Sequence, residues 1–136
     1  MTTVQPGRKD EPAGHPDRRS LLIKVTAGTD APERCSQAFT VAGTAAASGV
    51  AVSLWLTGEA AWFAVPGKAE EFTLPHAAPL ADLLDAVRSA GQVTVCTQCA
   101  QRRGIEVDDL LPGIRMGGAA GFVEEATAIG TQALVY

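Results

Sequence analysis

Val-Thr-Val-Cys-Thr-Gln-Cys-Ala-Gln-Arg-Arg-Gly, residues 93–104, is the stretch that decides the fold. Its first three residues are a short β-branched run that predicts a buried strand, and Cys96 ends that strand. Residues 97–103 predict a short helix that stops at Gly104. Parallel α/β sheets are built from strands that pass into helices, so we expect Cys96 at the carboxyl edge of such a sheet, where ligands and chemistry collect.

The segments on both sides of this stretch alternate in the same way. Strands are expected at 21–25, 50–56, 93–96, 114–116 and 133–136, and helices at 30–48, 79–90, 97–103 and 119–129. Short helical pieces are expected at 107–111 and around Trp62-Phe63. The helix over 79–90 is the clearest, because apolar residues repeat at i, i+3, i+4 and i+7 from Leu80. Asp30 is expected to be the N-cap of the first helix. This order predicts an α/β fold, a parallel sheet of five strands with helices on both faces.

The whole chain has the length and composition of one globular domain. It has 136 residues, of which 46% are apolar and 19% charged. Prolines and glycines among charges predict a flexible N-terminal tail over residues 1–19, and the domain would occupy 20–136. That tail has no apolar core segment, so no secretory signal is expected.

Charge and cysteine content narrow the classes of partner and compartment. A net charge of -4 and an aromatic content of 5% argue against nucleic acid or a membrane surface as a partner. The uncharged stretch 35–58 is rich in small residues and predicts a helix and a buried strand rather than a membrane span. Three cysteines, an odd number, fit a reducing compartment, so we expect a cytoplasmic protein.

The pair Cys96-Thr97-Gln98-Cys99 admits four interpretations. Both cysteines can be small buried side chains, as free cysteines often are. A structural metal site needs four ligands, and the other candidates are only Cys35, His15 and His76, so no metal is expected. The spacing also matches a dithiol redox motif. In the fourth interpretation Cys96 alone carries or transfers sulfur, because amides at the start of a helix stabilise a thiolate.

The segment from Val95 to Ile105 resembles the signature of the DsrE/TusD (DsrE/DsrF-like) family of sulfur-relay proteins, in which a cysteine ends the third strand and an Arg-Gly pair follows a short helix. Residues 50–58 resemble that family's second strand and turn, and residues 117–136 its late glycine-rich turn, helix and strand. The resemblance covers roughly residues 20–136 and implies a three-layer Rossmann-like fold with a five-stranded parallel sheet, assembled as trimers or hexamers. It also implies that Cys96 accepts a persulfide and passes it on, with sulfur donor and acceptor proteins as partners and no cofactor. Cys99 departs from the pattern, because the relay members have a small residue such as alanine there.

Several other residues are candidate accessories to Cys96. Cys99 is either a resolving thiol or a small core side chain, and Arg103 on the same helix could add positive potential if it folds back, as could Arg102. Glu59 follows the second strand and is expected at the same edge, where a carboxylate could orient a ligand or tune a thiol. Gly117 and Gly118 form either a tight turn or part of the floor beside Cys96.

Two functions of other classes remain open beside the sulfur carrier. One is a non-catalytic oligomeric module that binds a small ligand or a protein in a strand-end pocket. The other is a redox switch formed by Cys96 and Cys99. Self-assembly is expected in each case, with Trp62-Phe63 and the alanine-rich first helix as the apolar surface to be buried. Cys35, on the apolar stripe of that helix, is expected in the core.

Overall fold

The computed structural model describes residues 19–136. Five strands form its sheet: β1 (Ser20–Val25), β2 (Ala51–Leu56), β3 (Gln92–Cys96), β4 (Arg115–Gly117) and β5 (Thr131–Val135). The α-helices are α1 (Pro32–Ala47), α2 (Lys68–Glu71), α3 (Leu80–Ala90), α4 (Thr97–Arg102) and α5 (Ala119–Ala126), and two 3-10 helices are η1 (Gly58–Ala64) and η2 (Val107–Asp109). The tail expected over 1–19 lies, apart from Arg19, outside the described residues.

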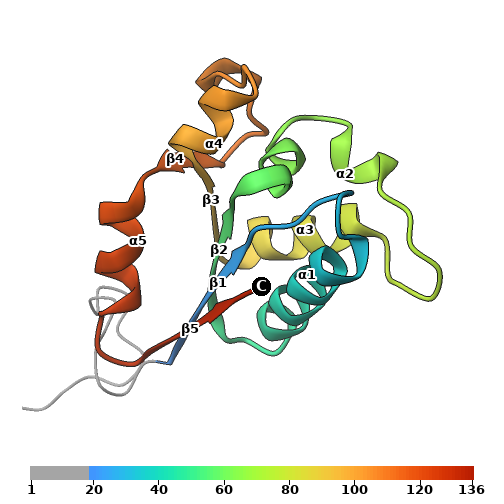
Figure 1. Cartoon of the computed structure of the whole chain (residues 1–136). Helices are drawn as coiled ribbons and strands as arrows, with labels where there is room; N and C mark the ends of the chain where they lie inside the picture. Colours follow the sequence, from blue (N-terminus) through green and yellow to red (C-terminus); the bar gives the residue numbers. More distant parts are fainter. Residues whose placement is uncertain (1–18) are drawn as a thin grey trace, which may run out of the picture.

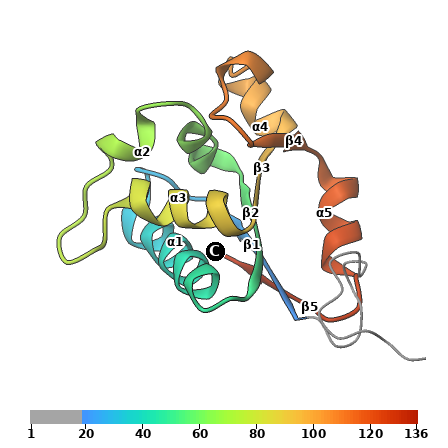
Figure 2. The same ribbon diagram turned by 180° about the vertical axis from the view of Figure 1, so that it is seen from behind.

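The sheet has the order β4-β3-β2-β1-β5, and every neighbouring pair is parallel. Helices α1 and α3 lie on one face and α5 lies on the other, which makes three layers (Figures 1 and 2). The predicted α/β fold with a five-stranded parallel sheet is therefore confirmed. The chain steps from β1 to β4 in one direction and returns past β1 to place β5 at the opposite edge.

The main core lies between the sheet and the pair α1 and α3. Helix α3 turns its apolar stripe inward, so that Leu80, Leu84 and Val87 are buried. The strands contribute branched side chains that are no more than 2% exposed, among them Ile23, Val25, Leu54, Leu56, Val93 and Val95. Burial of this kind contributes about 1.5–3 kcal/mol for each large apolar side chain. This core holds rigid the strand ends from which the site is built.

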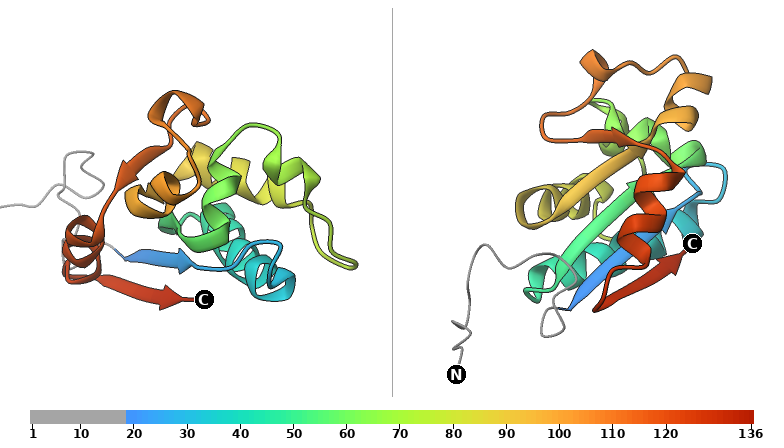
Figure 3. Two further views of the ribbon diagram at one scale, coloured as in Figure 1. Left: turned by 45° about the horizontal axis from the view of Figure 1, so that its top comes forward. Right: turned by 90° about the vertical axis from the view of Figure 1, so that its left-hand side faces the viewer.

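The opposite face is covered more thinly. Helix α5 crosses it alone (Figure 3), and none of its residues is fully buried. Its Phe122 ring packs edge-on against Trp55 of β2 at 5.4 Å, and Lys24 of β1 lies over the same ring at 5.1 Å. Val123 on this helix and Val135 on β5 are 56% and 64% exposed.

Two expected helix ends were wrong. Asp30 is not the N-cap of α1: Ala31 has that position, and the Asp30 carboxylate instead accepts a hydrogen bond from the Gly28 N–H at 2.8 Å. Helix α5 ends at Ala126 rather than at 129: Thr127 is its C-cap, the Thr127 hydroxyl donates to the Val123 carbonyl, and the chain then turns. Short polar side chains that bond the nearby backbone compete with helix continuation in this way.

Part of the apolar surface expected for self-assembly lies in the core. Phe63 is buried and packs edge-on against Phe39 and Phe72, whereas Trp62 stays partly exposed. The buried alanines of α1 face inward in the same way. Across residues 19–136, no helix combines the length and the apolar character needed to cross a bilayer.

Candidate functional site

Cys96 lies where the sequence placed it, at the carboxyl end of β3 and at the start of α4. It is the N-cap residue of that helix, with φ -62° and ψ 124°. Its side chain is partly exposed, whereas the preceding Val95 is fully buried. Strand β3 lies between β2 and β4, and Cys96 is directly opposite Gly117 in the register of β3 and β4. The Cys96 sulfur is thus attached to a rigid strand and lies at the carboxyl edge of the sheet.

The surroundings of the Cys96 sulfur favour its anion. The thiol makes no capping hydrogen bond within the usual geometric limits, yet the N–H groups of Cys99 and Gln98 point toward the sulfur. Partial burial acts to raise the pKa of the Cys96 thiol. The nearby Cys99 N–H, Cys99 thiol and Gln98 N–H, with the charge of Arg102, favour the thiolate enough to outweigh that effect and leave the pKa below its ordinary value. Cys96 is therefore the more ionised thiol of the pair.

Cys99 lies in the first turn of α4, with its side chain only 9% exposed. Burial raises the pKa of the Cys99 thiol, and the adjacent Cys96 raises it further through their hydrogen bond and through its negative charge. The Gly58 N–H and the charge of Arg103 oppose this rise without cancelling it. The two cysteines therefore have opposite characters, a thiolate-prone Cys96 near the surface and a protonated Cys99 beneath it.

Arg103 and Glu59 meet at this edge of the sheet. The Arg103 Nε and Nη2 atoms donate to one Glu59 carboxylate oxygen at 3.0 and 2.8 Å. The third nitrogen, Nη1, donates to the Cys99 carbonyl oxygen at 3.0 Å. Arg103 therefore folds back as expected, but it bonds the backbone of Cys99 rather than approaching Cys96. Of the two arginines it is Arg102, on the exposed side of α4, whose charge acts on Cys96.

Gly58 belongs to the site although the sequence analysis did not single it out. It begins η1 with a φ of +54°, which non-glycine residues rarely adopt. A Cβ atom there would collide with the Thr26 carbonyl oxygen. This close approach brings the Gly58 N–H to the Cys99 sulfur and places Glu59 opposite Arg103. The sequence feature that could have indicated Gly58 is its place in Thr57-Gly58-Glu59, directly after a buried strand.

Gly117 and Gly118 have different reasons to be glycine. At Gly117 a Cβ would lie 2.9 Å from both the Thr94 methyl carbon and the Trp55 ring. At Gly118 a Cβ would meet nothing within 4 Å. Gly117 is therefore required by the packing of Trp55 under β4, and it stands beside Cys96 because β3 and β4 are neighbours. An anion-binding role for either glycine stays a prediction.

The comparisons with known proteins concern the family and the fold. A model of the DsrE/DsrF-like family matches residues 19–134. The chain belongs to the DsrE/DsrF-like family. The crystal structure of the ychN protein from E. coli covers 87% of this chain and 99% of its own, with a TM-score of 0.71 and 15% identity. MTH1491, a protein of unknown function from Methanobacterium thermoautotrophicum, covers 88% and 100%, with a TM-score of 0.60 and 12% identity. Identities this low show the fold alone, and no curated protein matches the chain in sequence.

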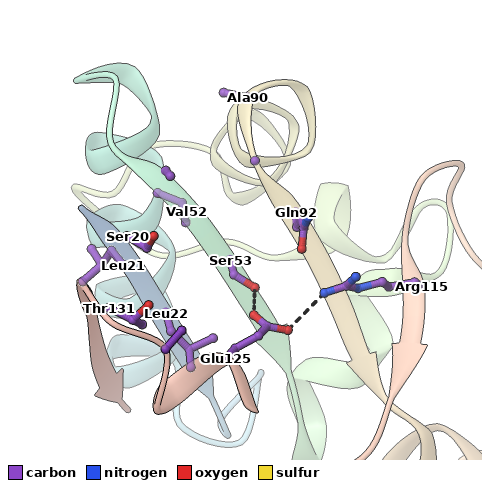
Figure 4. A pocket seen from close by; sticks show the side chains of 13 residues that line it. Ser20, Leu21, Leu22, Val52, Ser53, Ala90, Gln92, Arg115, Glu125 and Thr131 are labelled. Atoms are coloured by element: carbon purple, nitrogen blue, oxygen red, sulfur yellow. Dashed lines mark hydrogen bonds and ion pairs between the residues drawn. The ribbon is translucent and has the colours of Figure 1, made fainter. Parts of the chain in front are cut away.

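A cavity of this DsrE/DsrF-like chain lies away from Cys96. Its volume is about 380 Å³, and its wall includes Ser20, Ala51 and Gln92, the first residues of β1, β2 and β3. It is therefore at the amino edge of the sheet, opposite the edge that presents Cys96. Glu125 on its wall accepts hydrogen bonds from Ser53 at 2.6 Å and from Arg115 at 3.0 Å (Figure 4). Its charged groups are thus paired with each other, so the cavity holds no unpaired charge among the described residues.

Other candidate ligands and thiols take no part in the site. Cys35 is fully buried in α1 as expected, and burial, with the nearby negative charge of Asp30, raises its pKa to about 12. Within residues 19–136, no three side chains of the types His, Cys, Asp or Glu gather closely enough to hold a metal ion. The chemistry of this edge therefore rests on Cys96, Cys99 and the groups that surround them.

Proposed function

We propose that this chain is a sulfur-handling protein in which Cys96 carries a persulfide and relays sulfur to a partner protein. The observation that supports this most directly is a partly exposed thiol of lowered pKa on a rigid strand end. A sulfur carrier needs a thiolate at neutral pH, because the thiolate is the nucleophile, and it needs access to its partners. Membership of the DsrE/DsrF-like family supports the same proposal.

Loading and unloading are then two displacement steps at sulfur. The Cys96 thiolate attacks the outer sulfur of a donor persulfide, the S–S bond of the donor breaks, and the donor leaves as a thiolate. The product is a persulfide on Cys96. An acceptor nucleophile then attacks the outer sulfur of that persulfide and releases the Cys96 thiolate. A low thiol pKa helps the second step in particular, because Cys96 is then the leaving group.

Mass spectrometry after incubation with a cysteine desulfurase and cysteine tests the proposal. We expect one added sulfur atom, about 32 Da, that maps to Cys96 and is removed by dithiothreitol. Cys96→Ser should abolish this addition, whereas Cys35→Ala should retain it because Cys35 is buried and protonated. A sample in which a control carrier is loaded and Cys96 is not would refute the proposal.

A dithiol redox switch is the second candidate, and the position of both cysteines in the first turn of α4 favours it. It requires a Cys96–Cys99 disulfide after mild oxidation, with a potential within the range of cellular dithiols. A binding module without chemistry predicts instead that Cys96→Ser leaves partner or ligand binding nearly intact. The pairing of Glu125 with Arg115 makes the amino-edge cavity a poor candidate for charged ligands.

We further propose that the chain forms a homo-oligomer, a trimer or a hexamer, and that it works in the cytoplasm with sulfur donor and acceptor proteins. Parallel sheets are normally covered on both faces, yet Gln132, Ala133, Leu134 and Val135 of β5 are all exposed. Val123 and Ile129 add further apolar surface nearby in the chain, 56% and 67% exposed. Light scattering should give a mass above that of the 14.0 kDa chain, and Val123→Asp should lower it. A monomeric mass at micromolar concentration would contradict the proposal.

A location in the cytoplasm fits the same proposal, because a thiol carrier must stay reduced and the cytoplasm keeps thiols reduced.

A further inference from the structure

Cys99 has no part in the sulfur relay proposed above, although its thiol is next to the carrier sulfur. Cys96 is the N-cap of α4 and Cys99 is the third residue of that helix, so the two thiols are neighbours at one helix start, and each side chain shifts the pKa of the other. A carrier that only holds and passes sulfur does not need a second thiol at this place. A second thiol in contact with a persulfide can, however, displace its outer sulfur.

Two neighbours hold Cys99 in this place. The Gly58 N–H acts on the pKa of the Cys99 thiol, and Arg103 donates to the Cys99 carbonyl oxygen at 3.0 Å. Arg103 is in turn fixed by two hydrogen bonds to Glu59, so that η1 and the end of α4 are tied together across the sheet edge. Cys99 is only 9% exposed, so it is screened from outside thiols while it lies beside Cys96 in the first turn of α4. The arrangement confines the reactivity of Cys99 to its neighbour.

We propose that Cys99 is a resolving thiol, which discharges the persulfide on Cys96 as sulfide when no acceptor removes the sulfur. This inference rests on the proposed function. The Cys99 sulfur attacks the Cys96 Sγ atom, the bond from Sγ to the outer sulfur breaks, and a Cys96–Cys99 disulfide forms. The outer sulfur takes the bonding electron pair and the proton of the Cys99 thiol, and it leaves as hydrosulfide. The outer sulfur is thereby reduced to sulfide, the Cys99 sulfur is oxidised from thiol to disulfide, and no outside oxidant is needed.

The opposite characters of the two thiols suit these roles. Cys96, the exposed and more ionised thiol, is the one that meets a donor. Cys99 keeps its proton at neutral pH until Cys96 is loaded. The outer persulfide sulfur then takes that proton, and the Cys99 thiolate that this leaves is the nucleophile. The disulfide is then reduced by a cellular dithiol, since thiol–disulfide exchange needs access only to the exposed Cys96 sulfur. The chain would thus release sulfide and reset in one cycle.

The experiment uses the whole chain, reduced, desalted and kept free of oxygen. Each protein is treated with one equivalent of inorganic polysulfide, and intact mass and free sulfide are followed without added reductant. The variants are Cys99→Ala and Cys99→Ser, with Cys35→Ala as the matched control and Cys96→Ser as the blank. Circular dichroism establishes that each variant is folded.

In the unaltered chain and in Cys35→Ala, we expect a species about 32 Da heavier to decay to one about 2 Da lighter than the reduced protein, with one sulfide released for each disulfide. In both Cys99 variants the heavier species should persist at least about tenfold longer and release no sulfide beyond the amount that leaves the polysulfide during loading. Equal persistence with and without Cys99 would overturn the inference and leave the carrier proposal intact. If the Cys99 variants acquire no sulfur on Cys96 at all, the carrier proposal fails, and this inference fails with it.

Discussion

The two adjacent glycines beside the site make a sharp test of the structure. Gly117→Ala would place a methyl carbon 2.9 Å from the Thr94 methyl carbon and 2.9 Å from the Trp55 ring. Thr94 is 1% exposed and Trp55 is 3% exposed, so neither side chain has free space into which to move. Gly118→Ala would meet no atom within 4 Å, and its φ of -111° is an ordinary value for alanine.

The expected magnitudes follow from these contacts. Overpacking of a filled core costs about 1–3 kcal/mol. Replacing glycine by alanine returns about 0.4–1 kcal/mol, because the unfolded chain of the variant has less conformational freedom. Gly117→Ala should therefore lower the free energy of unfolding by about 1–2 kcal/mol. Gly118→Ala should leave it within about 0.5 kcal/mol of the original value, because only the slight preference of the N-cap for glycine over alanine opposes the gain.

Urea unfolding followed by circular dichroism measures both values under the same conditions. The midpoint should fall for Gly117→Ala and stay almost unchanged for Gly118→Ala, with similar slopes in all three proteins. Equal stability of the two variants would refute the reasoning, since it would mean that Trp55 does not fill the space under Gly117. A large loss for Gly118→Ala alone would mean that the space around Gly118 is filled rather than open.

Three further predictions concern the charges and thiols around Cys96. Arg102→Gln should move the midpoint of Cys96 alkylation by iodoacetamide to higher pH, because the Arg102 charge helps to lower the Cys96 pKa. A plot of alkylation rate against pH that does not move, at low or high salt, would contradict this. Glu59→Gln should destabilise the fold by only about 0.5–1 kcal/mol, because the Arg103–Glu59 pair that it breaks is partly exposed. A double-mutant cycle with Arg103→Gln that gives no coupling energy would refute the pairing. The free energy of unfolding should fall as pH rises above about 8.5, because unfolded Cys35 ionises there while folded Cys35 keeps its proton up to about 12. Its slope against pH should be steeper than in Cys35→Ala by up to about 1.4 kcal/mol per pH unit. Identical slopes in the two proteins would argue against the burial of this thiol.

Much of the fold could be predicted because its signals are local. The apolar stripe from Leu80 to Val87 and the β-branched run before Cys96 depend only on residues that are neighbours along the chain. The expected ends of α1 and α5 were wrong for a related reason. Whether Asp30 caps a helix or bonds the Gly28 N–H is decided by the path of the backbone after β1, which no short window of sequence contains.

The candidate site could be predicted only in part. Cys96 and its helix are contiguous, so the position of the thiol followed from the sequence. Glu59 and Arg103 are 44 residues apart, and their pairing depends on β2 and β3 being neighbours in the sheet. Arg103 was expected to act on Cys96, yet it holds the Cys99 backbone, because the geometry of a short helix decides where a long side chain can reach.

The sequence alone determined the alternation of strands and helices, the parallel character of the sheet and the presence of a thiol at a strand end, because periodicity and turn residues act over a few neighbours. The tertiary structure decided which strands are adjacent, and this adjacency places Gly117 against Trp55. It also decided how thinly one face of the sheet is covered and which of the two cysteines is exposed. Those properties depend on contacts between residues far apart in the chain, where each strand meets side chains that its own sequence does not specify.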